Sequence, residues 1–300
     1  MATKQRSRSR RPNSSRDRGP RYVAPVLDPG WQNPYAPSND ERQANLHFVR
    51  SFALRRSLPA TIVVSIVVIA LVVGVVVVAW LPLLAVVIGL VYAWYVRASI
   101  IKFERSGASL GTLMLDQFEA SGTPKDRQRL ITVLDRLSAT FGVDEVSAFI
   151  VHDAGYNAAL VPNGTSLSLF VTDAVMADFE LIELEGVVAH CLARHRLGLL
   201  NRESVAAVAQ LSDDARRTLA GPGSSYRADE VAAAAIRYPL GLAGALFKCA
   251  RQEPGAGSFF VTETYGKWRW VWFDIWSDRA STDLSDLDDV QLRALALEEW

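Results

Sequence analysis

The strongest pattern in the chain is an uninterrupted apolar stretch, in which no charged residue occurs from Ala60 to Val96. One straight helix of that length would run about 55 Å, whereas the hydrocarbon core of a bilayer is about 30 Å thick. Two spans of about 18 residues fit instead. The break is expected at Trp80-Leu81-Pro82, because Trp favours the membrane interface and Pro favours the first turn of a new helix. The pattern predicts a transmembrane helical hairpin over residues 56–98. Because the turn is short and apolar, a re-entrant hairpin remains an alternative.

Basic residues flank the predicted hairpin on both sides. Arg55 and Arg56 precede the first span, and Arg97, Lys102 and Arg105 follow the second. Loops rich in Lys and Arg stay on the cytoplasmic side of a membrane. We therefore expect a cell-membrane protein, with the lipid bilayer as a partner and with both termini and the C-terminal domain in the cytoplasm.

The chain before the hairpin is polar and basic. Its first 45 residues are rich in Arg, Ser, Pro and Asn and have no apolar periodicity, so we expect residues 1–55 to form a disordered tail. Two interpretations of its basic residues stay open. They can act as a topology signal that also touches anionic lipid, or they can bind an anionic polymer such as nucleic acid. The first is favoured because a membrane segment follows directly. The chain as a whole has a formal net charge of zero.

The remaining residues, 99–300, alternate between helical and strand patterns. Apolar residues at helical spacing follow Thr123-Pro124, and short alternating runs predict two strands. Further helices are expected at about 181–200, from Arg202 onward, at 224–238, up to about 251, and at 287–299. Trp268, Trp270 and Trp272 alternate as they would along a strand, with contact to the bilayer as an alternative role for this stripe. The predicted fold class is α+β and mostly helical. Two cysteines, Cys191 and Cys249, are too few for a disulfide framework and suit a reducing compartment.

The segment from Glu183 to His195 resembles the active helix of the HtpX-type membrane zinc metallopeptidases, relatives of the CAAX prenyl endopeptidases. In that family an E-L-x-x-V-x-A-H lead-in runs into H-E-x-x-H. The resemblance extends to the two-span anchor and to elements found in the same order, which are the edge strand Asn157-Ala158-Ala159, the strand Ser168–Thr172, the segment Tyr226–Asp229 and the closing segment Asp288–Leu295. It covers most of the chain after residue 55. The resemblance implies a zincin-like peptidase domain behind the hairpin.

The residues that would hold and use zinc are only partly present. In the family, two His at i and i+4 and a Glu on a later helix bind zinc, and a Glu after the first His activates water. By resemblance His190 occupies the first ligand position, but Cys191 stands at the base, Arg194 at the second His and Ser225 at the third ligand. Asp229, the carboxylate that supports the site, is retained. We expect His190 to be a buried imidazole hydrogen-bonded to Asp229.

The spacing of Cys191 and His195 allows two other roles, metal binding and nucleophilic catalysis. Cys191 and His195 are also i and i+4, so they could share a soft metal ion with partners that the sequence does not identify. Cys191 could otherwise be a nucleophile, but His195 one turn away points along the helix face rather than at the sulfur. The favoured interpretation of Cys191, and of Cys249, is a small buried apolar residue.

The expected function is that of a membrane-anchored, catalytically inactive relative of these peptidases, with a scaffold or regulatory role and no cofactor. The retained edge Asn157, Ala158 and Ala159 would pair with an extended peptide, from this chain or from a membrane-protein partner. Arg194 would oppose a zinc ion by about 8 kcal/mol at 4 Å and an effective dielectric of 20. We expect it to turn toward Asp229 or another acid instead. The alternatives are an active zinc endopeptidase with atypical ligands and a membrane tether for an anionic polymer. The sequence predicts no oligomeric state.

Overall fold

The computed structural model describes residues 33–73, 81–221, 223–253, 255, 257–275 and 289–300. Residues from Asn33 to the end form one compact unit. The basic run in residues 1–32 and Trp80 at the expected break lie outside the described residues, so the tail prediction is not addressed there. Most described residues are helical, and a small sheet makes the fold α+β, as the sequence predicts.

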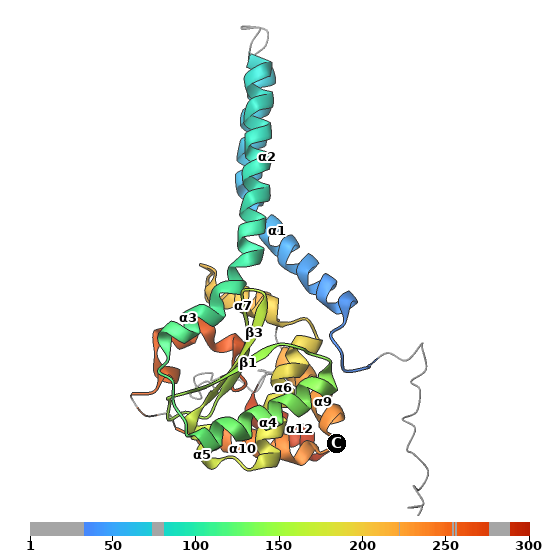
Figure 1. Cartoon of the computed structure of the whole chain (residues 1–300). Helices are drawn as coiled ribbons and strands as arrows, with labels where there is room; N and C mark the ends of the chain where they lie inside the picture. The colour runs from blue at the N-terminus through green and yellow to red at the C-terminus, as the bar shows by residue number, and fades with distance from the viewer. Residues whose placement is uncertain (1–32, 74–80, 222, 254, 256, 276–288) are drawn as a thin grey trace, which may run out of the picture. The chain divides into compact units, whose positions relative to one another are not determined.

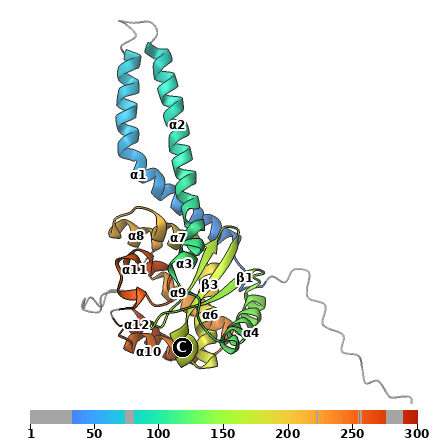
Figure 2. The ribbon, with the colours of Figure 1, turned by 60° about the vertical axis from the view of Figure 1, so that its left-hand side comes forward.

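Two long helices form the apolar hairpin. Helix α1 spans Asn39–Val73 and helix α2 spans Leu81–Ser106, and they run side by side (Figures 1 and 2). Their large apolar side chains face outward, since Ile62 is 59% and Leu90 67% exposed. Both helices are long and apolar enough to cross a membrane. Exposed apolar surface of this extent is stable where lipid covers it.

The hairpin helices extend well beyond the predicted bounds of 56 and 98, which corrects the extent of the tail. Residues 39–55 are helical rather than disordered. The physical reason is that one face of this segment packs on the domain, where Val49 is fully buried with Val205 and Leu219. The Asn45 side-chain amide also donates to the Leu197 carbonyl oxygen at 2.9 Å. Charges on the outer face hide this narrow apolar stripe in the sequence.

The sheet has three strands in the order β1-β3-β2. Strand β1 (Val146–Val151) runs parallel to β3 (Ser166–Thr172), and β2 (Ala158–Asn163) runs antiparallel to β3. Helix α4 (Pro124–Phe141) begins at a Thr123 capping box and ends at Gly142, which is left-handed with φ of 61°. Helix α4 and strands β1 and β3 form where the sequence predicts them, and β2 includes Ala158 and Ala159 of the expected edge but continues to Asn163.

Helix α6 (Leu181–Arg196) lies at the centre of the domain and packs against α4, α9 (Ser224–Ile236) and α10 (Pro239–Arg251). Gly186 makes the close contact with α10 possible, because a Cβ atom there would lie 2.7 Å from the Leu242 Cα atom. The other helices are α3 (Leu110–Gln117), α5 (Asp173–Asp178), α7 (Leu200–Val208), α8 (Asp213–Ala220), α11 (Glu263–Trp268) and α12 (Val290–Glu298).

The tryptophan stripe is not a strand, and that prediction was wrong. Trp268 ends α11, and residues Arg269–Val271 form a 3-10 turn, η4. Trp268 and Trp272 enter one apolar cluster, whereas Trp270 enters another. Alternate burial in two clusters therefore produces the alternation that reads as a strand. All three rings are buried within the domain, rather than presented to a bilayer.

Candidate functional site

The site that the sequence singles out is wholly buried. Helix α6 carries His190, Cys191 and Arg194, each at most 1% exposed. Helix α9 faces it and carries Ser225 and Asp229, also buried. The structure thus packs together the two helices that carry the residues singled out by the sequence, with His190 of α6 in contact with Asp229 of α9.

His190 is held by Asp229, as expected. The Nδ1 atom of His190 lies 2.7 Å from the Asp229 Oδ1 atom. Burial lowers the pKa of His190 to about 4, so the imidazole is neutral at pH 7. We place its proton on Nδ1, because an ionised carboxylate only accepts hydrogen bonds. The Nε2 atom is then a buried acceptor, and it has no hydrogen-bond partner within the described residues.

Asp229 has a second partner that the sequence analysis missed. Arg293 of α12 donates from Nε to Asp229 Oδ2 at 2.6 Å and from Nη2 to Oδ1 at 3.0 Å. Burial alone would raise the pKa of Asp229, but Arg293 and His190 lower it below its ordinary value. Arg293 lies in the closing segment that forms part of the resemblance. Its position between the apolar residues Leu292 and Ala294 was the sequence signal that could have indicated a buried arginine.

Arg194 turns to Glu203 rather than to Asp229. Its Nε atom lies 3.2 Å and 3.1 Å from the two carboxylate oxygens of Glu203 on α7, and both residues are almost fully buried. The expectation that Arg194 pairs with an acid of the domain is therefore confirmed, but the acid named first was wrong. Asp229 is already committed to Arg293 and His190, so a second guanidinium has no free oxygen to take.

Both arginines also bind one stretch of backbone, Trp270 to Asp274, here called the clamped segment. Arg194 Nη1 donates to the carbonyl oxygens of Val271 at 3.0 Å and Trp272 at 2.8 Å, and its Nη2 atom donates to that of Trp270. Arg293 Nη1 donates to the Phe273 carbonyl oxygen at 2.8 Å. Two buried cations thus satisfy four successive carbonyl groups.

The clamped segment lies along the strand edge that the sequence marks for peptide binding. The Phe273 amide donates to the Ala158 carbonyl oxygen at 2.7 Å, and Ala159 forms an antiparallel bridge with Trp272. The Asn157 side chain donates to the Asp274 carbonyl oxygen at 3.0 Å and accepts from the Asp274 amide at 2.9 Å. The edge at Asn157, Ala158 and Ala159 therefore pairs with the chain's own backbone.

Both cysteines are free and buried. Burial raises the pKa of Cys191 to about 12, so its sulfur stays protonated at pH 7. Cys249 is buried, and its Sγ atom donates to the Tyr156 carbonyl oxygen at 3.7 Å. Burial and Arg42 lower the pKa of His195 to about 4. The charge that acts on His195 is Arg42 of α1, whereas Cys191 is acted on by Arg194, Glu203 and Arg293. Cys191 and His195 therefore lie in different surroundings.

These residues do not fit a zinc ion. His190 Nε2 is one suitable donor, but a catalytic zinc takes three protein ligands and a water. Two guanidinium groups would oppose a dication here, and neither deprotonates in proteins. Within the described ranges, no group of three or more His, Cys, Asp or Glu residues is placed to hold a metal. What the arrangement does is hold peptide carbonyl groups by charge-assisted hydrogen bonds.

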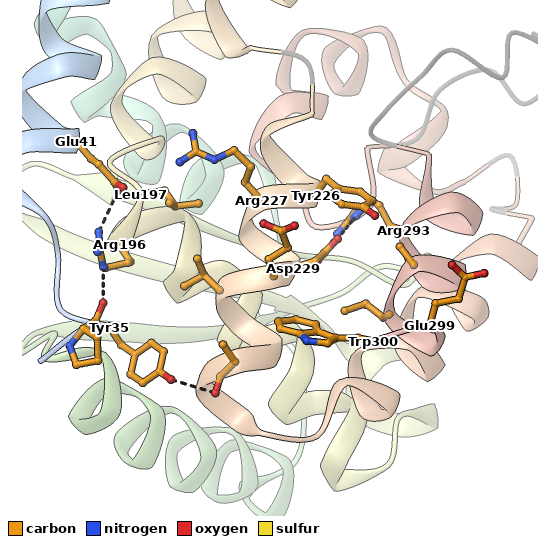
Figure 3. A pocket seen from close by; sticks show the side chains of 16 residues that line it. Tyr35, Glu41, Arg196, Leu197, Tyr226, Arg227, Asp229, Arg293, Glu299 and Trp300 are labelled. Atoms are coloured by element: carbon orange, nitrogen blue, oxygen red, sulfur yellow. Dashed lines mark hydrogen bonds and ion pairs between the residues drawn. The ribbon is translucent and has the colours of Figure 1, made fainter.

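A pocket of about 640 Å³ opens beside the Asp229–Arg293 pair (Figure 3). Tyr226 and Trp300 are among its walls, and the Arg196–Glu41 ion pair, at 3.0 Å, borders it on another side. Asp229 is only 3% exposed and Arg293 is fully buried. The pocket therefore reaches the edge of the ion pair without opening the site around His190 to solvent.

Comparison with protein-family models found no match to this chain, and comparison with curated proteins also found none. The resemblance to the HtpX-type peptidases accordingly rests on the residues themselves. The chain is an α+β protein with two helices able to span a membrane and a buried site around His190.

Proposed function

We propose that this chain is a membrane-anchored, non-catalytic relative of the HtpX-type zinc peptidases, acting as a scaffold or regulator. Its soluble part would be a degenerate zincin-like domain. It would lie on the cytoplasmic side together with both termini, because basic residues flank both spans. Possible partners are an extended peptide or another membrane protein.

The observation that carries this proposal is the pair of buried ion pairs at the positions that zinc chemistry needs. Arg194 is paired with Glu203 and Arg293 with Asp229 beside a neutral His190, so guanidinium groups rather than a metal compensate the carboxylates there. Cys191 in its protonated form cannot take a proton from water, so the role of the general base has no candidate at that position.

The clamped segment supports the same proposal. An extended substrate binds a peptidase of this type by adding to an edge strand. Here the amide and carbonyl groups at that edge are bonded to Trp272, Phe273 and Asp274 of the same chain. A substrate would have to displace a segment that two buried arginines hold. A partner is therefore expected to bind the domain on another surface.

A cleavage assay tests the proposal. The purified full chain, in detergent and with added zinc, is incubated with an unfolded protein substrate, with and without a metal chelator. We expect no chelator-sensitive cleavage, and His190→Ala should behave as the unmodified chain does. Cleavage that is lost both with chelator and in His190→Ala would overturn the proposal and favour an active zinc endopeptidase with atypical ligands. In that enzyme the His190 Nε2 atom, which has no partner among the described residues, would bind zinc.

A further inference from the structure

A small polar pocket of about 240 Å³ lies away from the site around His190, between the start of α1 and the β2–β3 turn. Its polar walls come from four elements that are distant in the sequence. Arg42 is on α1, Thr165 is in the turn, His195 is at the end of α6 and Asn201 is in the first turn of α7. None of the residues that line the pocket is an acid.

Several side chains around this pocket have hydrogen-bonding groups without a protein partner among the described residues. The Asn201 Nδ2 atom is buried and has no hydrogen-bond partner in the part of the chain that the structure describes. No hydrogen bond or ion pair of the side chains of Arg42, Thr165 or His195 occurs among those residues either. A buried amide donor without a partner destabilises the fold, so a group that accepts a hydrogen bond from it would stabilise the fold.

The pocket is built on rigid contacts rather than on a loose approach of two surfaces. The Asn45 amide donates to the Leu197 carbonyl oxygen, and the Ser38 amide donates to the Arg196 carbonyl oxygen at 3.4 Å. Gly198 has φ of 68°, and a Cβ atom there would lie 2.9 Å from the Arg42 Cα atom. This close packing fixes the backbone from which Arg42 projects.

We propose that this pocket binds a phosphate group. A guanidinium, an amide donor, a hydroxyl group and an imidazole, with no carboxylate beside them, are the donors that a tetrahedral oxyanion takes. The volume holds a phosphate group and several waters, since a water occupies about 30 Å³. Burial and then Arg42 lower the pKa of His195, and an anion bound between Arg42 and His195 would offset the repulsion between their positive charges when His195 is protonated.

Two sources can supply such a group, namely free phosphate or the headgroup of an anionic phospholipid. The pocket also contains Ala108, which follows directly on α2, and Leu46 of α1, so it lies near the base of the apolar hairpin. Either source presents the same oxygens to Arg42. The experiment therefore has one arm for each.

The test is binding by the full chain in detergent, measured by calorimetry with inorganic phosphate and, separately, with short-chain phosphatidylglycerol against phosphatidylcholine of the same chain length. Arg42→Gln removes the cation from the pocket. Arg55→Gln is the matched control, because Arg55 is an exposed arginine of the same helix that does not line the pocket. Thr165→Glu is a second variant, which places a carboxylate at an exposed turn position and leaves Arg42 in place.

We expect Arg42→Gln and Thr165→Glu to weaken binding at least tenfold, as loss of a charge-assisted hydrogen bond does, and Arg55→Gln to leave it nearly unchanged. Weakened phosphate binding in the two pocket variants assigns the site to free phosphate. Weakened phosphatidylglycerol binding in these variants, without phosphate binding, assigns it to a lipid headgroup. Binding in neither arm, or equal loss in Arg55→Gln and both pocket variants, overturns the proposal.

Discussion

Removing the buried cation of Arg194 is the perturbation that tests the described site most sharply. Arg194→Met keeps most of the side-chain volume but deletes the charge. It removes the guanidinium that pairs with Glu203, a carboxylate that is fully buried. It also leaves the carbonyl groups of Trp270, Val271 and Trp272 without the guanidinium that they share.

The expected loss of stability follows from those contacts. Breaking a buried ion pair by removing one partner costs about 3–5 kcal/mol, mainly because a charge stays buried alone. For a domain of this size, 1 kcal/mol corresponds to about 2–4 °C in the unfolding midpoint, so the shift should be roughly 6–20 °C. Glu203→Gln in the same background should recover part of the loss, because the buried negative charge that Arg194 compensated is then gone.

Thermal unfolding of the purified chain in detergent measures this, with tryptophan fluorescence as the signal, since Trp270 and Trp272 belong to the clamped segment. The matched control is Arg136→Met. Arg136 pairs with Glu185 at the surface and is 57% exposed, so its loss should cost at most about 1 kcal/mol. A midpoint for Arg194→Met that matches the control would refute the reasoning, as would strictly additive effects of Arg194→Met and Glu203→Gln.

Three further outcomes are expected. Stability should fall as the pH drops from about 6.5 toward 4, because the unfolded chain protonates its histidines at about 6.5, whereas burial keeps the pKa of His190 and His195 at about 4 in the fold. Unfolding midpoints between pH 7.5 and 4.5 check this, and a smaller decline in the double variant His190→Gln/His195→Gln is required. The Phe273 and Asp274 amides should resist hydrogen exchange as strongly as β2, because both donate to the strand edge; exchange at the rate of an open loop would remove the clamp from the account. An impermeant thiol reagent applied to intact cells should fail to label a cysteine added near either terminus, and labelling from outside would reverse the proposed topology.

Much of the fold follows from local patterns. An uncharged run from Ala60 to Val96 has no stable place in water, so the hairpin helices are evident from composition alone. Thr123 and Gly142 mark the ends of α4 by capping chemistry. The tryptophan stripe misled because alternate burial in two clusters has the same period as a strand. Residues 39–55 were expected to be disordered because their packing on the domain depends on one narrow apolar stripe among polar residues.

The site was predictable only in part, where the resemblance itself pairs two segments. The His190–Asp229 hydrogen bond follows from the two helices that the resemblance pairs. Glu203 and Arg293 were missed because each lies on another element, and their pairing with Arg194 and Asp229 depends on how α7 and α12 pack. The clamped segment was missed for the same reason, since nothing local in Trp270 to Asp274 indicates an arginine on α6.

Zinc content of the full chain tests the central claim most directly. The chain is purified without chelator, equilibrated with zinc and dialysed, and its metal is then measured by elemental analysis beside that of His190→Ala. The account predicts well under one zinc per chain and no difference between the two proteins, because His190 is the one suitable donor that the described residues place at this site, beside two guanidinium groups. One zinc per unmodified chain, lost in His190→Ala, would contradict it.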